Sequence, residues 1–131
     1  MLSLRVSLSA LALVAASLVG CGSDEPHVDI GDVTVGTRTF HVFREGDPIA
    51  AGASTRLVLK STAGGNPASI TGWIGVESAE GSTKAQANFD AGDGDYDDNL
   101  TCPSPLPAGA KFWFTVVDES GQSLTGSIDY K

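Results

Sequence analysis

Apolar residues recur at every second position along most of the chain after residue 26, which is the period of a β-strand with one buried face. Seven segments show this pattern: 28–35, 40–43, 53–61, 70–76, 85–89, 112–116 and 124–130. Residues 78–82 and 118–121 have the composition of tight turns between neighbouring strands. Without a helical segment, the pattern predicts an all-β fold, a small antiparallel β-sandwich of about seven strands, immunoglobulin-like or fibronectin-like.

The first 20 residues differ from the rest. A short start with Arg5 as its only charge leads into an apolar run from Val6 to Gly20. This is the form of a secretory signal, and the run is short for a membrane-spanning helix. It ends Leu18-Val19-Gly20-Cys21, which resembles the lipobox of bacterial lipoproteins, a family cut before the cysteine.

The resemblance covers residues 1–21 and implies that Cys21 carries a diacylglycerol on its thiol and usually an acyl chain on its amine. Residues 1–20 are then the signal peptide, 21–26 a lipidated tether and 27–131 a single β domain. In Gram-negative members, Gly22 rather than Asp after the cysteine implies the outer membrane. The alternative is ordinary cleavage, for example after Ser17, which frees Cys21 for a disulfide with Cys102.

Charge narrows the classes of partner. The chain has 16 acidic and 8 basic residues, a net charge of −8, and no basic patch. A surface this acidic repels nucleic acid, so we expect no nucleic-acid partner, and it favours cations and basic partners.

The densest polar feature is an acidic segment over 90–99, expected as a loop between the fifth and sixth predicted strands. Its five carboxylates are Asp90, Asp93, Asp95, Asp97 and Asp98. Asp93, Asp95 and Asp97 stand at alternate positions, which partly resembles the start of an EF-hand loop. The Gly and the bidentate Glu that an EF-hand loop requires are missing, and so are its flanking helices. Two interpretations stay open: a looser Ca²⁺ site and a solvated acidic turn.

The second feature is aromatic. Trp73 and Trp113, with Phe43, lie opposite the aliphatic residues of their predicted strands. If those aliphatic residues form the core, the aromatic side chains point outward and form a patch for a glycan or a protein ligand. The alternative is that the tryptophans point inward or lie under a loop.

Catalysis has the least support. The two histidines are His27 and His41, and no nucleophile motif, phosphate loop or His/Cys metal spacing accompanies them. The sequence therefore predicts a non-catalytic binding or structural module, anchored by lipid in the cell envelope. The alternatives are a Ca²⁺-dependent adhesion or ligand-binding domain using loop 90–99, and a small envelope hydrolase, which requires a pocket holding His41 beside an acid.

Overall fold

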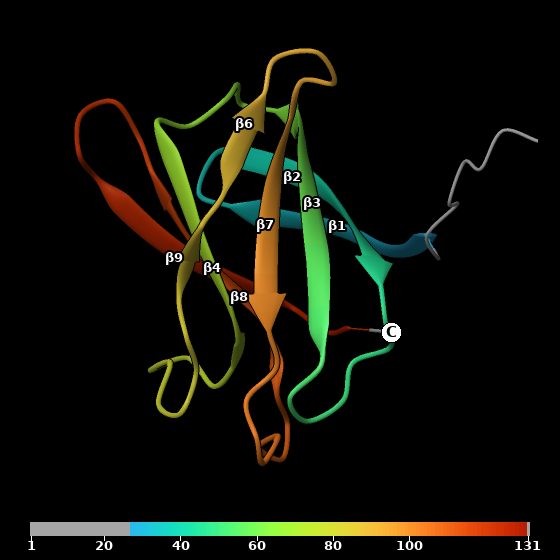
Figure 1. Cartoon of the computed structure of the whole chain (residues 1–131). Coiled ribbons are helices and arrows are strands. Elements are labelled where there is room, and N and C mark those ends of the chain that lie inside the picture. Colours follow the sequence, from blue (N-terminus) through green and yellow to red (C-terminus); the bar gives the residue numbers. More distant parts are fainter. Residues whose placement is uncertain (1–26, 131) are drawn as a thin grey trace, which may run out of the picture.

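A computed structural model describes residues 27–130; the predicted signal, Cys21 and the tether lie outside this range. Figure 1 shows the strands. The described residues form nine of them: β1 (His27–Val35), β2 (Arg38–Gly46), β3 (Ser54–Ala63), β4 (Ser69–Gly75), β5 (Ala85–Gln86), β6 (Asn88–Asp90), β7 (Asp95–Thr101), β8 (Lys111–Val117) and β9 (Ser123–Ile128). Within residues 27–130, no helix is long and apolar enough to cross a membrane.

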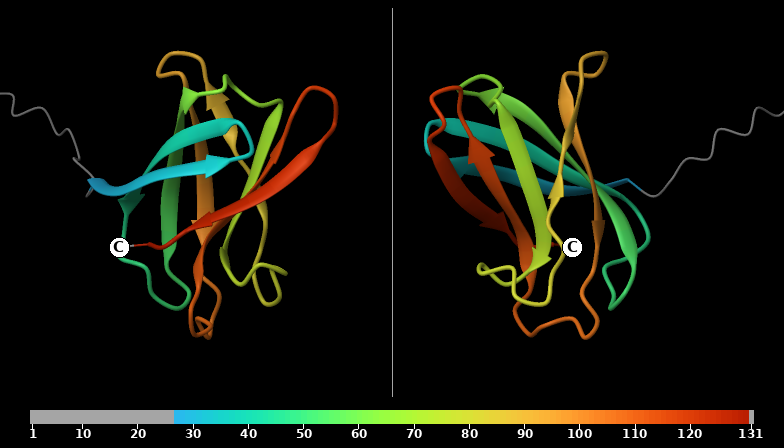
Figure 2. Two further views of the ribbon diagram at one scale, coloured as in Figure 1. Left: turned by 180° about the vertical axis from the view of Figure 1, so that it is seen from behind. Right: turned by 60° about the vertical axis from the view of Figure 1, so that its left-hand side comes forward.

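The strands pair into two antiparallel sheets packed face to face (Figure 2), so the predicted all-β sandwich is confirmed. One sheet has the order β1-β2-β3-β7-β6 and the other β5-β4-β8-β9. From β2 to β9 this connectivity follows the immunoglobulin order, A-B-E-D in one sheet and C′-C-F-G in the other. Strand β1 is an additional edge strand that pairs with β2.

The core lies between the sheets and is built from alternate residues of the strands. Phe40 of β2 and Phe114 of β8 meet edge to face, with ring centroids 6.3 Å apart. Aliphatic residues from facing strands fill the space around them; the most buried are Val42, Leu57, Leu59, Ile70, Ile74 and Leu100. The period-two pattern therefore identifies the inward side of these strands correctly.

Two strand predictions are wrong. Residues 95–101, expected as part of a loop, form β7, the neighbour of β3 in the five-stranded sheet. The predicted strand 85–89 is two strands: β5 pairs with β4, and β6 pairs with β7 in the opposite sheet. Asp and Asn have low intrinsic strand propensity, so the sequence of β7 favours a loop. Pairing with β3 overrides this preference and makes the segment a strand.

The β8–β9 hairpin is confirmed, and one carboxylate organises its turn. Asp118 Oδ1 accepts hydrogen bonds from Ser120 Oγ at 2.6 Å and from the amides of Ser120 and Gln122. The Ser120 hydroxyl is the largest influence holding the pKa of Asp118 below its ordinary value. Gly121 takes a φ of 84°, which favours glycine at this position.

The β1–β2 hairpin depends on Gly36. It turns through Gly36 and Thr37, since Val35 pairs with Arg38, and Gly36 has a φ of 63°. This is the place of glycine in a type II′ turn. A Cβ there would also lie 2.6 Å from Leu124 Cδ1 of β9.

We expect Gly36→Ala to lower the free energy of unfolding by about 1–2 kcal/mol, chiefly through backbone strain at its positive φ, because Leu124 Cδ1 ends a flexible, half-exposed side chain that can move aside. Gly52→Ala is the matched control: Gly52 has a φ of 76° but nothing within 4 Å of a Cβ. Urea unfolding of both variants measures the difference. Equal losses would show that the approach of Leu124 carries no cost.

Candidate functional site

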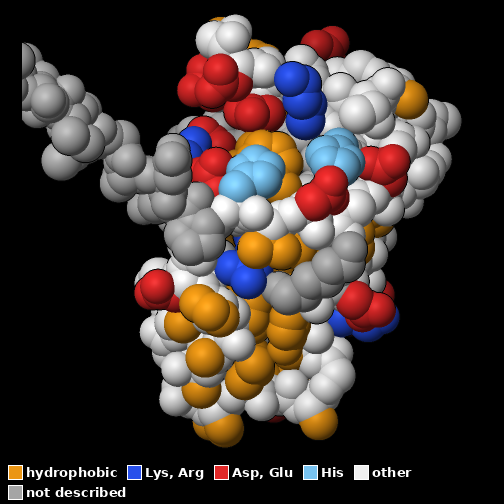
Figure 3. Space-filling model, turned by 90° about the vertical axis from the view of Figure 1, so that its right-hand side faces the viewer, with side chains coloured by type: hydrophobic (Ala, Val, Ile, Leu, Met, Phe, Trp, Pro, Cys, Tyr) orange, Lys and Arg blue, Asp and Glu red, His pale blue; other side chains and the backbone are white. Residues whose placement is uncertain are grey.

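The outer face of the five-stranded sheet gathers most of the polar chemistry. Because side chains alternate, Phe43 and Glu45 of β2 point away from the core, as do Arg56 and Lys60 of β3. The register places Glu45 opposite Arg56, and Lys60 opposite Asp95 of β7. Figure 3 shows this side of the molecule, with both histidines among acidic and basic side chains.

A groove of about 340 Å³ crosses this face. Phe43 and Val58, neighbours in the β2–β3 register, are its apolar residues. The remaining lining is ionisable: His27, Glu45, Arg56, Lys60, Asp93, Asp95 and Asp97. The described lining is therefore mainly charged, unlike the mostly apolar lining of small-molecule pockets, and it suits a charged ligand.

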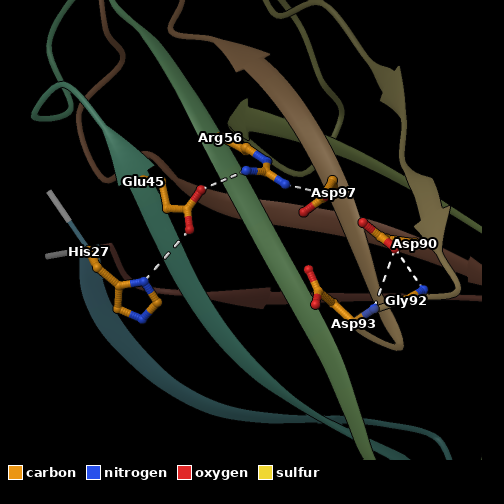
Figure 4. A network of polar contacts seen from close by, with 7 residues as sticks. All are labelled: His27, Glu45, Arg56, Asp90, Gly92, Asp93 and Asp97. Atoms are coloured by element: carbon orange, nitrogen blue, oxygen red, sulfur yellow. Dashed lines mark hydrogen bonds and ion pairs between the residues drawn. The ribbon is translucent and has the colours of Figure 1, made fainter. Parts of the chain in front are cut away.

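One wall of the groove is held by a chain of ion pairs (Figure 4). Arg56 bridges two strands: it donates to Glu45 Oε2 at 2.8 Å and lies 2.6 Å from Asp97 Oδ2. His27 Nδ1 lies 3.7 Å from Glu45 Oε1. The hydrogen bond to Asp97 is the largest influence raising the pKa of Arg56. The arrangement fixes Arg56 and leaves Asp97 Oδ1 buried without a hydrogen bond from any described residue.

Asp95 is the most unusual residue of the groove. It is 8% exposed, and no described residue donates a hydrogen bond to it or pairs with it as an ion. Burial is the largest cause raising the pKa of Asp95, followed by the negative charges of Asp97, Asp93 and Asp90. The carboxylate therefore lines the groove in an environment that favours an added positive charge.

Asp98 lies on the other face of β7, inside the core. It is 1% exposed, and neither of its carboxyl oxygens has a hydrogen-bond partner of acceptable geometry among residues 27–130. Desolvation raises the pKa of Asp98 to about 7, an effect that the nearby amide of Gly72 partly opposes. Glycine at 72 makes room for the carboxyl, because a Cβ there would collide with Asp98 Oδ2.

The predicted Ca²⁺ site is not assembled in the structure. Strand β7 sends Asp95 and Asp97 outward and Asp98 inward, because successive side chains of a strand point to opposite faces. Asp90 instead accepts hydrogen bonds from the amides of Gly92 and Asp93 in the β6–β7 turn (Figure 4). Among residues 27–130, no three His, Cys, Asp or Glu side chains lie close enough to hold a metal ion.

Of the two interpretations left open for the tryptophans, the structure favours the second for Trp73, which lies under a loop. Trp73 does point away from the core, but it is 1% exposed, because the 76–84 segment covers it. Its Nε1–H donates to the carbonyl of Val76 at 2.7 Å, and Lys84 Nζ lies 4.6 Å from its ring centre. Trp113 stacks on it at 6.4 Å, donates to the carbonyl of Gly75 and is only partly buried. The two rings therefore hold a loop on the sheet and do not form an open aromatic patch.

His41 and Cys102 complete the residues singled out in the sequence. His41 Nδ1 lies 2.7 Å from Asp32 Oδ1, and Nε2 lies 3.4 Å from Asp29 Oδ2. His41 therefore stands beside two carboxylates on the sheet face, and it does not line the groove described above. Cys102 is a buried free thiol, as expected for a small apolar residue.

Glu45, Arg56 and Lys60 were not predicted as site residues from the sequence, His27 was noted without a site, and Phe43 was assigned to the aromatic patch and not to this groove. A partial signal was present: His41, Phe43 and Glu45 alternate along one strand, and Arg56 and Lys60 flank an apolar triplet on the next. The sequence alone does not give the strand register, and it is the register that places the outward residues of β2 and β3 beside Asp95 and Asp97. Comparison of the chain with protein-family models, with curated proteins and with solved structures found no match.

Proposed function

We propose that this protein is a lipid-anchored, non-catalytic binding module of the cell envelope, and that the groove on its five-stranded sheet is the ligand site. The observation that carries the proposal is Asp95, a buried carboxylate that has no hydrogen bond or ion pair from residues 27–130 and lines a groove beside Phe43 and Val58. Leaving such a group unsatisfied costs stability, and because Asp95, unlike the core residue Asp98, lines a groove, a ligand can supply the missing contact. The lipid anchor rests on the lipobox resemblance at Cys21.

The groove suits binding better than catalysis or Ca²⁺ capture. Among residues 27–130, its lining contains neither a Ser, Thr or Cys nucleophile nor His41. Of its carboxylates, Asp97 is already bound to Arg56, which leaves too few free oxygen ligands for a calcium ion. A positively charged or hydrogen-bond-donating organic ligand meets the available groups more completely.

The anchor is tested by Cys21→Ser. We expect this variant to leave the membrane fraction entirely, because the serine cannot receive the thioether-linked lipid whose acyl chains hold the protein there. Cys102→Ala, which removes the other cysteine, is the control and is expected to stay with the membrane. Fractionation of cells followed by detection of the protein measures both, and a Cys21→Ser protein still in the membrane fraction would refute the anchor.

The groove is tested by thermal unfolding of the chain from residue 21 with Cys21→Ser, against a panel of basic peptides, neutral peptides and glycans. A groove ligand should raise the melting temperature in proportion to RT ln(1 + [L]/Kd), and Asp95→Asn should abolish the rise. A panel that leaves the melting temperature unchanged, or a rise that survives Asp95→Asn, would refute the groove as the binding site.

A further inference from the structure

The geometry points to a specific class of ligand, and we propose that the groove binds the guanidinium group of an arginine side chain from a basic partner protein. The inference rests on the proposed function of the groove as a binding site and adds the chemistry of what occupies it. Three features of the groove carry it: its unpartnered carboxylate, its aromatic base and its balance of charge.

The carboxylates come first. Asp95 has no hydrogen bond or ion pair with any described residue, and it is more than nine-tenths buried. Asp97 lies two residues further along the same face of β7, with one oxygen bound to Arg56 and the other unpartnered. A guanidinium carries five donors in a flat fork, so one group can donate to two neighbouring carboxylates.

The aromatic base favours guanidinium over ammonium. Phe43 lines the groove beside Val58, and the His27 ring, 57% exposed, lies over it with ring centroids 4.3 Å apart and planes inclined by 31°. A guanidinium is planar and weakly hydrated, stacks on aromatic faces and carries an apolar stem. An ammonium is strongly hydrated and gains less from such a surface.

The charges in the groove leave it negative. Four carboxylates line it (Glu45, Asp93, Asp95 and Asp97) against the two cations Arg56 and Lys60. Arg56 is committed to its two carboxylates. Lys60 stands opposite Asp95 in the β3–β7 register but forms no ion pair within the described part of the chain. The Lys60 ammonium therefore competes with a cationic ligand for the position beside Asp95.

To test this, the chain from residue 21 with Cys21→Ser is titrated with the capped peptide acetyl-Gly-Arg-Gly-amide. Binding is measured from the changes in the amide chemical shifts of the protein. The citrulline peptide has the same shape without the charge, and the lysine peptide has the charge without the planar fork. Asp95→Asn tests the carboxylate, and Asp129→Asn, the same change directly after β9 and next to Lys111 of the other sheet, is the control. Melting curves of both variants confirm that they fold.

We expect the arginine peptide to shift the amides of β3 and β7, and its affinity to fall about tenfold or more in Asp95→Asn and to stay unchanged in Asp129→Asn. Lys60→Gln should bind several times more tightly, because the competing cation is gone. Equal affinity for the citrulline or lysine peptide, or a weaker Lys60→Gln variant, would overturn the inference. If only a glycan or a neutral peptide binds, and Asp95→Asn abolishes that binding, the groove remains the ligand site and the arginine assignment alone fails.

Discussion

The free energy of unfolding of the folded domain is expected to fall by about 4 kcal/mol as the pH rises from about 4 to about 8. The cause is Asp98, whose pKa is about 7 in the folded core against an ordinary value of 3.8. Between these two values the unfolded chain has released the proton of Asp98 and the folded protein still holds it. The unfolded state therefore binds fewer protons, and rising pH favours it. The stability is fully present below the unfolded pKa, and the loss is complete above the folded one.

Urea unfolding at a series of pH values measures this slope, and Asp98→Asn is the matched variant because asparagine keeps the shape and cannot ionise. We expect its stability to change far less over the same range. Asp95, whose pKa is also raised, acts in the same direction and accounts for a remaining slope. A variant with the slope of the unmodified protein would show that Asp98 does not stay protonated in the core.

Trp73→Ala is expected to cost about 3–5 kcal/mol of stability, the range found when a large aromatic side chain is removed from a packed interior. The loss has two parts: the contacts of Trp73 with Trp113, and the hydrogen bond that ties Trp73 to Val76. Equilibrium unfolding in urea measures it. Proteolysis provides a second readout, because the 76–84 segment loses the ring on which it rests and becomes easier to cleave.

Leu124→Ala is the comparison, because Leu124 is a large apolar side chain that is 45% exposed. Its loss should change stability by less than about 1 kcal/mol. If Trp73→Ala is as mild as Leu124→Ala, the tryptophan is a surface residue, and the aromatic patch predicted from the sequence regains its support.

The fold class follows from the sequence because the inward face of most strands is apolar and regular. Phe112, Phe114 and Val116 specify the buried face of β8 without any knowledge of their partners. Strand β7 escaped prediction because its sequence, Asp-Tyr-Asp-Asp-Asn-Leu-Thr, resembles a loop. Its inward set of Tyr96, Asp98 and Leu100 does alternate, but a carboxylate in the middle hides the pattern.

The site was harder to predict for two physical reasons. Residues in the groove come from four strands, and only the pairing register brings them together. The second reason is that a side chain pointing away from the core was assumed to be exposed. This holds for Lys60, but Trp73 is covered by a loop and Val58 is only 2% exposed on the outer face. Direction follows from period, whereas exposure depends on what packs above the sheet.

Strand β1 begins at His27, which lines the groove, and this position has a consequence for where a partner can be met. Six residue steps separate Cys21 from His27, so even a fully extended chain spans no more than about 21 Å. If Cys21 is lipidated as proposed, His27 stays within that distance of the bilayer surface. A partner held in the same membrane then meets the groove at a high effective concentration, so a weak contact through one arginine suffices for capture. Lengthening the segment 21–26 should weaken such capture without changing the affinity for a free peptide.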